Sequence, residues 1–345
     1  MLVGTRFKKA IRFVALAAGV TLAATGCSAV TGDTTDAASD DGSFQLADYI
    51  AQDIADGNPL VIKLSYHDPS LAFAKPIREG MERAGAEFGV DVQLVGPTGG
   101  DAAQQVSELQ TLISQEAIHG IAVSSASSDA LKPIIAEAFN AGIPIISFNT
   151  DNPDSLQMAF VGQDLRGSGR SQAEELVATL EGRGVASGSV VVFSIDTGAG
   201  WSNERFGGFE EGMEGAGFDV VGPVDTGSEP SQAYNIVEST MTGQSDVVAI
   251  AGLDCCSTTA AGTWIQQSGN SGVVVMAGFD LLPQTADFVS AGVVTFTISQ
   301  NPSEQGYQAV KVLYDFLING ITPAGVDTGA QFVTLDNLSE ATVEG

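Results

Sequence analysis

The sequence predicts an α/β protein made of two doubly wound lobes with parallel sheets. From residue 60 onward, short apolar runs alternate with longer amphipathic segments, which is the signature of βα units. Two of the runs, 190–193 and 273–276, are apolar throughout, so helices are expected to cover both faces of these strands. About 285 residues of such units exceed what one hydrophobic core usually holds, and this indicates two lobes.

The expected strands and helices follow one another in a regular order. Segment 106–113 repeats apolar residues at helical spacing. Asn301, Pro302 and Glu304 predict the start of a helix that runs to about residue 319, with Asn301 as the cap and Glu304 reaching back to it. The apolar runs expected to be strands are 60–65, 92–95, 120–124, 144–148, 190–193, 247–251, 273–279 and 295–298.

The lobe boundary is expected at a composition break at 161–163. A strand-like segment, 331–335, follows the last long helix, so the chain should cross between the lobes more than once and form a hinge of several strands. The predicted organisation is a signal peptide over 1–26, a flexible tether over 27–57, an N-terminal lobe from 58–161 plus 302–326, and a C-terminal lobe from 162–301 plus 327–345.

The first 27 residues predict export from the cytoplasm. Four basic residues precede an apolar stretch over 13–22, and small residues then lead into Cys27. The apolar stretch is shorter than the roughly 20 residues of a spanning helix, so we expect the leader to be removed. The junction before Cys27 resembles a bacterial lipobox, in which this cysteine carries a diacylglyceryl group, although Ala24 stands where leucine is more typical. The alternative is an ordinary signal peptide followed by an incidental cysteine.

The chain after the leader is strongly acidic. Residues 28–43 are almost wholly Ser, Thr, Gly, Ala and Asp, a composition that cannot bury a core and therefore predicts a tether. The formal net charge is −28, and the leader holds four of the 14 basic residues and none of the 42 acidic ones. Nucleic acid and anionic lipid headgroups would be repelled, so we expect no nucleic-acid partner.

Eight short sequence blocks between residues 60 and 317 occur in a characteristic order. They include AGIPIISFN at 141–149, VGQD at 161–164, NERFGGF at 203–209 and AGFD at 277–280. The ordered set resembles the ribose-binding-protein family of periplasmic sugar receptors, which are substrate-binding lipoproteins of ABC importers. The resemblance implies a type I periplasmic-binding-protein fold, in which a three-stranded hinge joins two lobes that close on one sugar.

Polar residues follow the expected strands at their carboxyl ends, where open parallel sheets bind ligands. A sugar requires carboxylates and amides that bridge hydroxyls, an Arg donor, and aromatic faces against its C–H surface. The expected ligand-binding residues are Tyr66, His67, Phe73, Ser124, Asn149, Thr150, Trp201, Arg205, Asp254, Asp280 and Gln300.

The resemblance gives roles to four of these residues. It implies that Phe73 stacks on the ligand, Arg205 donates to it, Asp280 accepts from a hydroxyl and Gln300 supplies an amide at the hinge. The alternatives are a turn or helix cap for Asp280 and a salt bridge on a helix face for Arg205. Trp201 is either a second stacking face or a packing plug.

The sequence also departs from the family pattern. Asn149 and Thr150 stand where the ribose receptor has an Asp-Arg pair, and Leu253 and Asp254 replace an Asn-Asp pair. The loss of one Arg and one carboxylate argues against ribose as the ligand. A pentose, a hexose, an inositol and a furanosyl signalling molecule all fit the residue types.

Catalytic and metal sites have little support in the sequence. The two histidines, His67 and His119, are far apart in the sequence, and there is no Gly-x-Ser-x-Gly elbow. A glycine-rich turn begins at Gly198, but Asn203 stands where a dinucleotide fingerprint needs its third glycine. We therefore expect a binding protein without metal or cofactor, and a secreted α/β enzyme is the weaker alternative.

The predicted function is that of a monomeric extracytoplasmic lipoprotein that binds a small neutral sugar or polyol and delivers it to the permease subunits of an ABC importer. The same fold serves in sugar-responsive repressors and in receptors for membrane sensors. A repressor needs a basic N-terminal helix-turn-helix, which the leader and acidic tether exclude. A receptor that signals to a membrane sensor is the open alternative, which neighbouring permease or kinase genes would discriminate.

Cys255 and Cys256 are adjacent and follow an expected strand beside Asp254. An oxidising exterior favours a disulfide between them, which would present an apolar plate toward the cleft. Strain in the intervening peptide favours two free thiols instead. Both alternatives are open at this point.

The leader yields a test of anchoring. We expect Cys27 to be lipidated, because it follows a small-residue cleavage site and precedes a tether. A clickable fatty acid should label the protein in growing cells, and Cys27→Ser should abolish the label and release the protein to the medium. Label on the Cys27→Ser chain would contradict the prediction.

Overall fold

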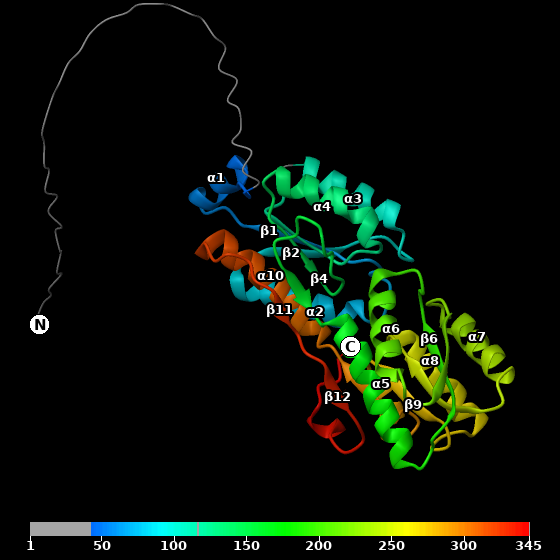
Figure 1. Ribbon diagram of the computed structural model, residues 1–345. Helices are drawn as coiled ribbons and strands as arrows, with labels where there is room; N and C mark the ends of the chain where they lie inside the picture. Colours follow the sequence, from blue (N-terminus) through cyan, green and yellow to red (C-terminus); the bar gives the residue numbers. More distant parts are fainter. Residues whose placement is uncertain (1–42, 116, 345) are drawn as a thin grey trace, which may run out of the picture. The chain divides into compact units, whose positions relative to one another are not determined.

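The computed structural model describes residues 43–115 and 117–344. The predicted leader, Cys27 and most of the predicted tether lie outside the described residues. The described part contains two six-stranded sheets, each surrounded by helices (Figure 1). We call the parts built on these sheets the N-terminal lobe and the C-terminal lobe. None of the described helices is long and apolar enough to span a bilayer.

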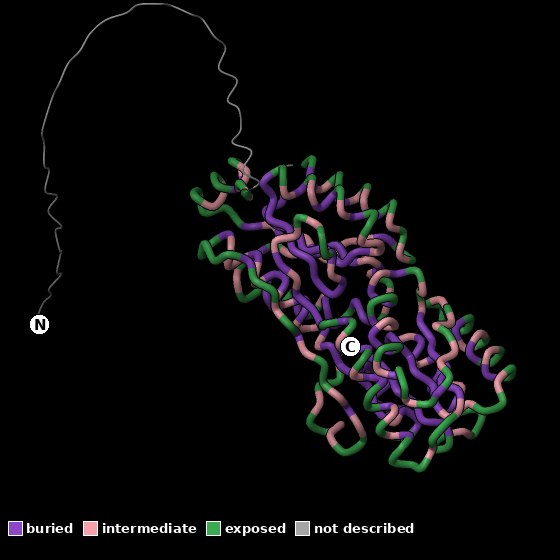
Figure 2. The backbone as a smooth tube through the Cα atoms, viewed as in Figure 1, coloured by how far each residue is buried: buried purple, intermediate pink, exposed green. Residues whose placement is uncertain are grey.

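Six parallel strands form the sheet of the N-terminal lobe. Its two central strands, 120–123 and 145–148, are buried along their whole length because helices cover both faces (Figure 2). Across the sheet the order is β11 (Val326–Asp327), β5 (Phe160–Gly162), β4 (Ile145–Phe148), β3 (Gly120–Val123), β1 (Val61–Ser65) and β2 (Asp91–Val95). The helices are α1 (Asp48–Asp56), α2 (Ala74–Phe88), α3 (Ala102–Ser114), α4 (Ser128–Asn140) and α10 (Pro302–Asn319).

The C-terminal lobe repeats this plan with one antiparallel edge strand. The order is β12 (Gln331–Val333), β10 (Phe296–Ser299), β9 (Val275–Phe279), β8 (Val247–Gly252), β6 (Gly188–Ser194) and β7 (Phe218–Asp225), and only β12 runs against its neighbour. The helical segments are α5 (Leu165–Gly182), α6 (Gly200–Met213), α7 (Pro230–Thr242), α8 (Cys255–Ser268), α9 (Pro283–Ser290) and the short 3₁₀ helix η1 (Leu338–Glu340). The prediction of two doubly wound parallel lobes is confirmed.

Within the described residues the chain passes between the lobes three times, after β5, after β10 and after β11. Side chains on two of the crossing segments donate hydrogen bonds to backbone carbonyls of the third segment. Gln163 Nε2 donates to Gly329 O at 3.1 Å, and Asn301 Nδ2 donates to Thr328 O at 2.7 Å. Thr328 Oγ1 donates in turn to Gln300 O at 2.9 Å. These bonds fix the register of the three-stranded hinge that the resemblance implied.

Asn301 occupies the predicted N-cap position of α10, and the helix ends where the sequence indicated, but the predicted capping hydrogen bonds do not form. Asn301 has a φ of +51°, and its side chain donates to the hinge instead of accepting from the helix. Glu304 does not reach back to Asn301 and lies 3.2 Å from the guanidinium of Arg83. A hinge hydrogen bond therefore replaces the helix cap.

The first turn of α10 finds its partner at the other end of the chain. The N–H of Ser303 donates to Glu344 Oε2 at 3.0 Å. The N–H of Glu344 donates to Leu281 O in the C-terminal lobe at 3.1 Å. Glu344 thus links the two lobes beside the hinge.

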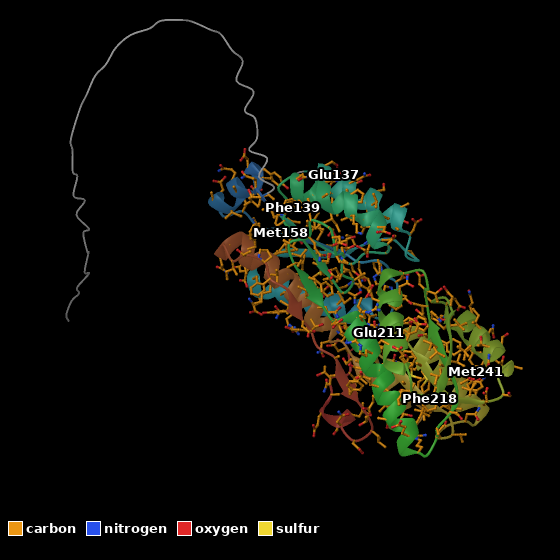
Figure 3. All side chains as sticks on the ribbon, viewed as in Figure 1. Glu137, Phe139, Met158, Glu211, Phe218 and Met241 are labelled. Carbon is orange, nitrogen blue, oxygen red and sulfur yellow. The ribbon has the colours of Figure 1, made fainter. Side chains whose placement is uncertain are left out.

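The predicted flexible tether extends too far toward the C-terminus. Phe44 packs edge-on against Phe139 and Phe316, with ring centroids 5.1 and 5.6 Å apart (Phe139 is labelled in Figure 3). Helix α1 buries Ile50, and Asp53 Oδ2 lies 3.1 Å from His119 Nε2. Residues 44–57 therefore belong to the N-terminal lobe, because apolar and polar partners distant in the sequence hold them.

Helices α5 and α6 approach each other until their backbones touch. A Cβ on Gly169 would lie 1.9 Å from Arg205 O, and one on Gly208 would lie 1.9 Å from Arg166 O. Arg166 and Arg170 on α5 both donate to Glu211 on α6, which Figure 3 labels. Only glycine permits this spacing, and it fixes the position of Arg205.

The helix contact yields a stability prediction. Gly169→Ala should lower the free energy of unfolding by about 1–3 kcal/mol, because the added methyl group must push α6 away. Gly182→Ala, on the same helix, is the matched control, since a Cβ there meets nothing within 4 Å. Chemical denaturation should show no loss for the control. Equal stability of the two variants would contradict close helix packing.

Candidate ligand-binding site

A small cavity lies between the lobes at the carboxyl ends of both sheets. Its volume is about 40 Å³, and Gln300 at the hinge is one of its lining residues. Ligand sites for small molecules are usually about 300–1,000 Å³, whereas one water takes about 30 Å³. The lining residues are Tyr66, His67, Leu71, Phe73, Asn149, Leu165, Ile195, Trp201, Arg205, Asp254, Cys255, Asp280 and Gln300. A sugar-sized ligand therefore fits only after the lobes separate.

The wall from the N-terminal lobe combines aromatic rings with one amide. Tyr66 directly follows β1, and its ring lies 4.2 Å from the His67 ring. Phe73 is buried at the start of α2. Asn149 follows β4 with a φ of +60°, and its Nδ2 donates to Gln305 Oε1 at 3.0 Å. The aromatic faces of this wall suit the C–H surface of a sugar ring.

His67 is held neutral in this wall. Its Nδ1 lies 2.9 Å from Ser124 Oγ, and Ser124 Oγ donates to Asn149 Oδ1 at 3.1 Å. Burial lowers the pKa of His67 to about 4, with the nearby Asp68 opposing the shift. The imidazole therefore offers a hydrogen bond without charge at neutral pH.

Arg205 is the cation of the opposite wall. Its guanidinium donates to Leu253 O at 2.6 Å and to Gln163 Oε1 at 3.1 Å, and it lies 3.9 Å from the centre of the Phe279 ring. Its Nε has no hydrogen-bond partner among the described residues, although the side chain is buried. Burial lowers the pKa of Arg205 to about 10, so it stays charged at neutral pH.

Asp280 supplies the anion. It follows β9 with a φ of +68°, and its Oδ1 accepts from Gln300 Nε2 at 2.8 Å. Burial raises the pKa of Asp280 to about 6, and Arg205 partly opposes this shift. No ion pair joins Asp280 to Arg205 within 4.0 Å in the part of the chain that the structure describes. The two charges thus face one small volume without neutralising each other directly.

Asp254 has a structural task as well. Its Oδ1 accepts from the N–H groups of Cys256 and Ser257, and its Oδ2 accepts from Ile195 N–H and the Ser257 hydroxyl. The carboxylate therefore caps α8 and joins it to the end of β6. Burial raises its pKa, and the four hydrogen bonds oppose that shift.

The structure brings nine of the eleven predicted ligand residues to the cavity. Ser124 is fully buried behind His67 and does not line it. Thr150 lines a groove of about 750 Å³ beside the hinge, which shares Trp201 and Leu165 with the cavity. The ligand contacts of all eleven residues stay predictions.

Three apolar lining residues were missed by the sequence reading. Ile195 directly follows β6, and the search for polar residues past strand ends passed over it. Leu165 begins α5 after its cap Asp164, and Leu71 precedes α2. Of these three residues only Ile195 could have been found from the sequence, because only Ile195 directly follows a strand.

The two adjacent cysteines are free thiols here. Their Sγ atoms lie 3.2 Å apart, whereas a disulfide needs about 2.05 Å. The ligating atoms of Asp254, Cys255 and Cys256 lie within 4.8 Å of one another. Both oxygens of Asp254 already accept hydrogen bonds, so its carboxylate is committed to α8.

Comparison with known proteins places this architecture among binding proteins. Residues 62–320 match the family model described as periplasmic binding protein domain. The xylose/arabinose-binding protein XylF of Sulfolobus acidocaldarius is 30% identical over 290 residues, which are 79% of this chain and 70% of that protein.

Solved structures show the same fold. An ABC transporter solute-binding protein from Burkholderia graminis, in complex with D-arabinose, has 24% identity and a TM-score of 0.77, covering 82% of this chain and 98% of that one. A carbohydrate transporter solute-binding protein from Agrobacterium radiobacter, also with D-arabinose, has 25% identity and a TM-score of 0.76, covering 82% and 96%.

The raised pKa of Asp280 yields a pH prediction for the protein without added ligand. Below about pH 3 the carboxyl group is protonated in both the folded and the unfolded chain. As the pH rises to 7, the unfolded chain gains more from ionisation, so the folded state loses about 3 kcal/mol of stability. The unfolding free energy of the wild type minus that of Asp280→Asn should therefore fall by about 3 kcal/mol as the pH rises to 7. A constant difference over this range would contradict the buried charge.

Proposed function

The chain belongs to the periplasmic binding protein family, as its ordered sequence blocks predicted, and we propose that it binds one small neutral sugar or polyol between its lobes. The protein is not an enzyme, since its family and its named relatives are binding proteins. The observation that carries the proposal is the buried, mutually unpaired couple of Arg205 and Asp280 between aromatic walls.

The chemistry of this couple fits hydroxyl groups. A hydroxyl both donates and accepts, so one sugar can give a hydrogen bond to Asp280 and take one from Arg205 Nε. Both bonds are charge-assisted and add affinity, since hydrogen bonds to charged groups contribute about 1.5–3 kcal/mol each. Phe73 and Trp201 supply the apolar faces. A ligand with a net charge would be repelled by one of the two buried charges, either Arg205 or Asp280.

Binding couples to closure of the hinge. Tyr66, His67, Phe73 and Asn149 come from one lobe, and the charged residues come from the other. A ligand can satisfy both sets together only when the lobes meet, so it stabilises the closed form by its differential affinity.

The proposal includes delivery to an ABC importer from a lipid anchor on Cys27. The name of XylF as a xylose/arabinose-binding protein and the D-arabinose in two related structures support a monosaccharide of pentose size. The solute-binding protein from Burkholderia graminis belongs to an ABC transporter, which supports the transport role.

A thermal-shift panel tests the proposal. Purified mature protein is heated with D-xylose, D- and L-arabinose, D-ribose, D-allose, D-glucose, myo-inositol and a set of amino acids. A true ligand at a hundred times its dissociation constant should stabilise the protein by about 2.7 kcal/mol. Shifts with amino acids and with no sugar or polyol would show that the carbohydrate assignment is wrong.

A variant pair tests the site. Asp280→Asn should weaken sugar binding by about 10- to 150-fold in calorimetry at pH 7.5, because it removes a buried charged acceptor. Asp219→Asn is the control, since Asp219 is an exposed acidic residue on β7. Equal affinity of the two variants would remove Asp280 from the site.

A further inference from the structure

Cys255 and Cys256 form a partition between two cavities. Cys255 is buried and lines the ligand cavity, and both residues line a second groove of about 630 Å³ formed by α7, α8, α9 and the residues around the start of α2. Cys256 is partly exposed in that groove. A thiol reagent in the outer groove can therefore reach Cys256 without entering the ligand cavity.

The backbone of this pair holds one carboxylate of the C-terminal wall. The N–H of Cys256 donates to Asp254 Oδ1 at 2.9 Å, and Asp254 lines the ligand cavity. Cys255 and Leu282 also pack against the core of the N-terminal lobe. Cys255 thus contributes both to the ligand wall and to the contact between the lobes.

A helix cannot accommodate a disulfide between neighbouring residues. Successive side chains on a helix point about 100° apart around its axis, whereas a disulfide requires the two Cβ atoms to lie about 3.5–4.5 Å apart. Cys255 and Cys256 are the first two residues of α8. Closing the bond must therefore change the backbone at these positions, where the N–H of Cys256 binds Asp254.

We propose that Cys255 and Cys256 are a reversible thiol–disulfide site, and that oxidation unwinds the first turn of α8, releases Asp254 and weakens ligand binding. The effect on affinity rests on the proposed sugar-binding function, whereas the formation of the disulfide does not.

The co-reactant is a disulfide, such as glutathione disulfide or the active-site disulfide of an oxidoreductase. The Cys256 thiolate attacks one sulfur of this disulfide and expels the first thiol. The Cys255 sulfur then displaces the second thiol and forms the Cys255–Cys256 bond. Two cysteine thiols lose two electrons and two protons, which reduce the external disulfide to two thiols. The hydrogen bond between the two thiols and burial raise the pKa of the Cys255 thiol, so the partly exposed Cys256 reacts first.

The closing experiment uses the full chain with Cys27→Ser, so that only this pair carries thiols. The protein is equilibrated in defined ratios of reduced to oxidised glutathione, alkylated and weighed by mass spectrometry, with and without D-xylose. We expect loss of both alkylation sites on oxidation, at least tenfold weaker D-xylose binding, and faster amide exchange at Cys256 and Ser257. By linkage, saturating D-xylose should raise the midpoint potential by about 30 mV for each tenfold difference in affinity.

Cys256→Ser is the control, because it removes the exposed partner, and its affinity should not respond to the redox ratio. Two alkylated thiols under the most oxidising ratio would overturn the inference. A disulfide that leaves both amide exchange and affinity unchanged would overturn it as well. If D-xylose and the rest of the panel bind neither form, the proposed function fails, while mass and amide exchange still decide whether the thiol site exists.

Discussion

The side-chain amide of Gln305 links α10 to the ends of β4 and β10 by hydrogen bonds. It is fully buried on α10, where its Oε1 accepts from Asn149 at the end of β4 and its Nε2 donates to Gln300 O at the end of β10. A buried amide that loses such partners costs about 1–3 kcal/mol for each unsatisfied group. The hinge strands are therefore held in one register, and through Gln300 that register extends to Asp280 in the cavity.

Each lobe also brings one helix into backbone contact with its neighbour beside the cavity. In the C-terminal lobe the contact at Gly169 and Gly208 positions Arg205. In the N-terminal lobe a Cβ on Gly80 would lie 1.7 Å from Ser303 O, and one on Gly306 would lie 2.1 Å from Ile77 O, so α10 and Gln305 are fixed against α2 in the same manner. Polar residues of the cleft are thus carried on helices with little freedom to shift.

The sequence allowed the lobes, most of the strands and most of the cavity wall to be predicted, because buried parallel strands have a strong apolar signal and ligands bind past their carboxyl ends. It missed β5, β7 and β11. Its errors have a common physical origin in contacts between distant segments. Asn301 reads locally as a helix cap, but Thr328 captures its side chain. Phe44 and Ile50 follow a disordered composition, yet they find partners as far away as Phe316. Leu71 and Leu165 line the cavity because of lobe closure, which no local pattern encodes.

The small size of the cavity has a kinetic meaning. With only about 40 Å³ between the walls, the closed arrangement of the lobes cannot admit a sugar, so binding requires the open form. The observed dissociation constant then exceeds the intrinsic one by the reciprocal of the open fraction. Association must also level off at high ligand concentration, when hinge opening limits the rate. The hydrogen bond between the Ser303 N–H and Glu344 spans the lobes, so it stabilises the closed form and opposes the opening that ligand entry requires.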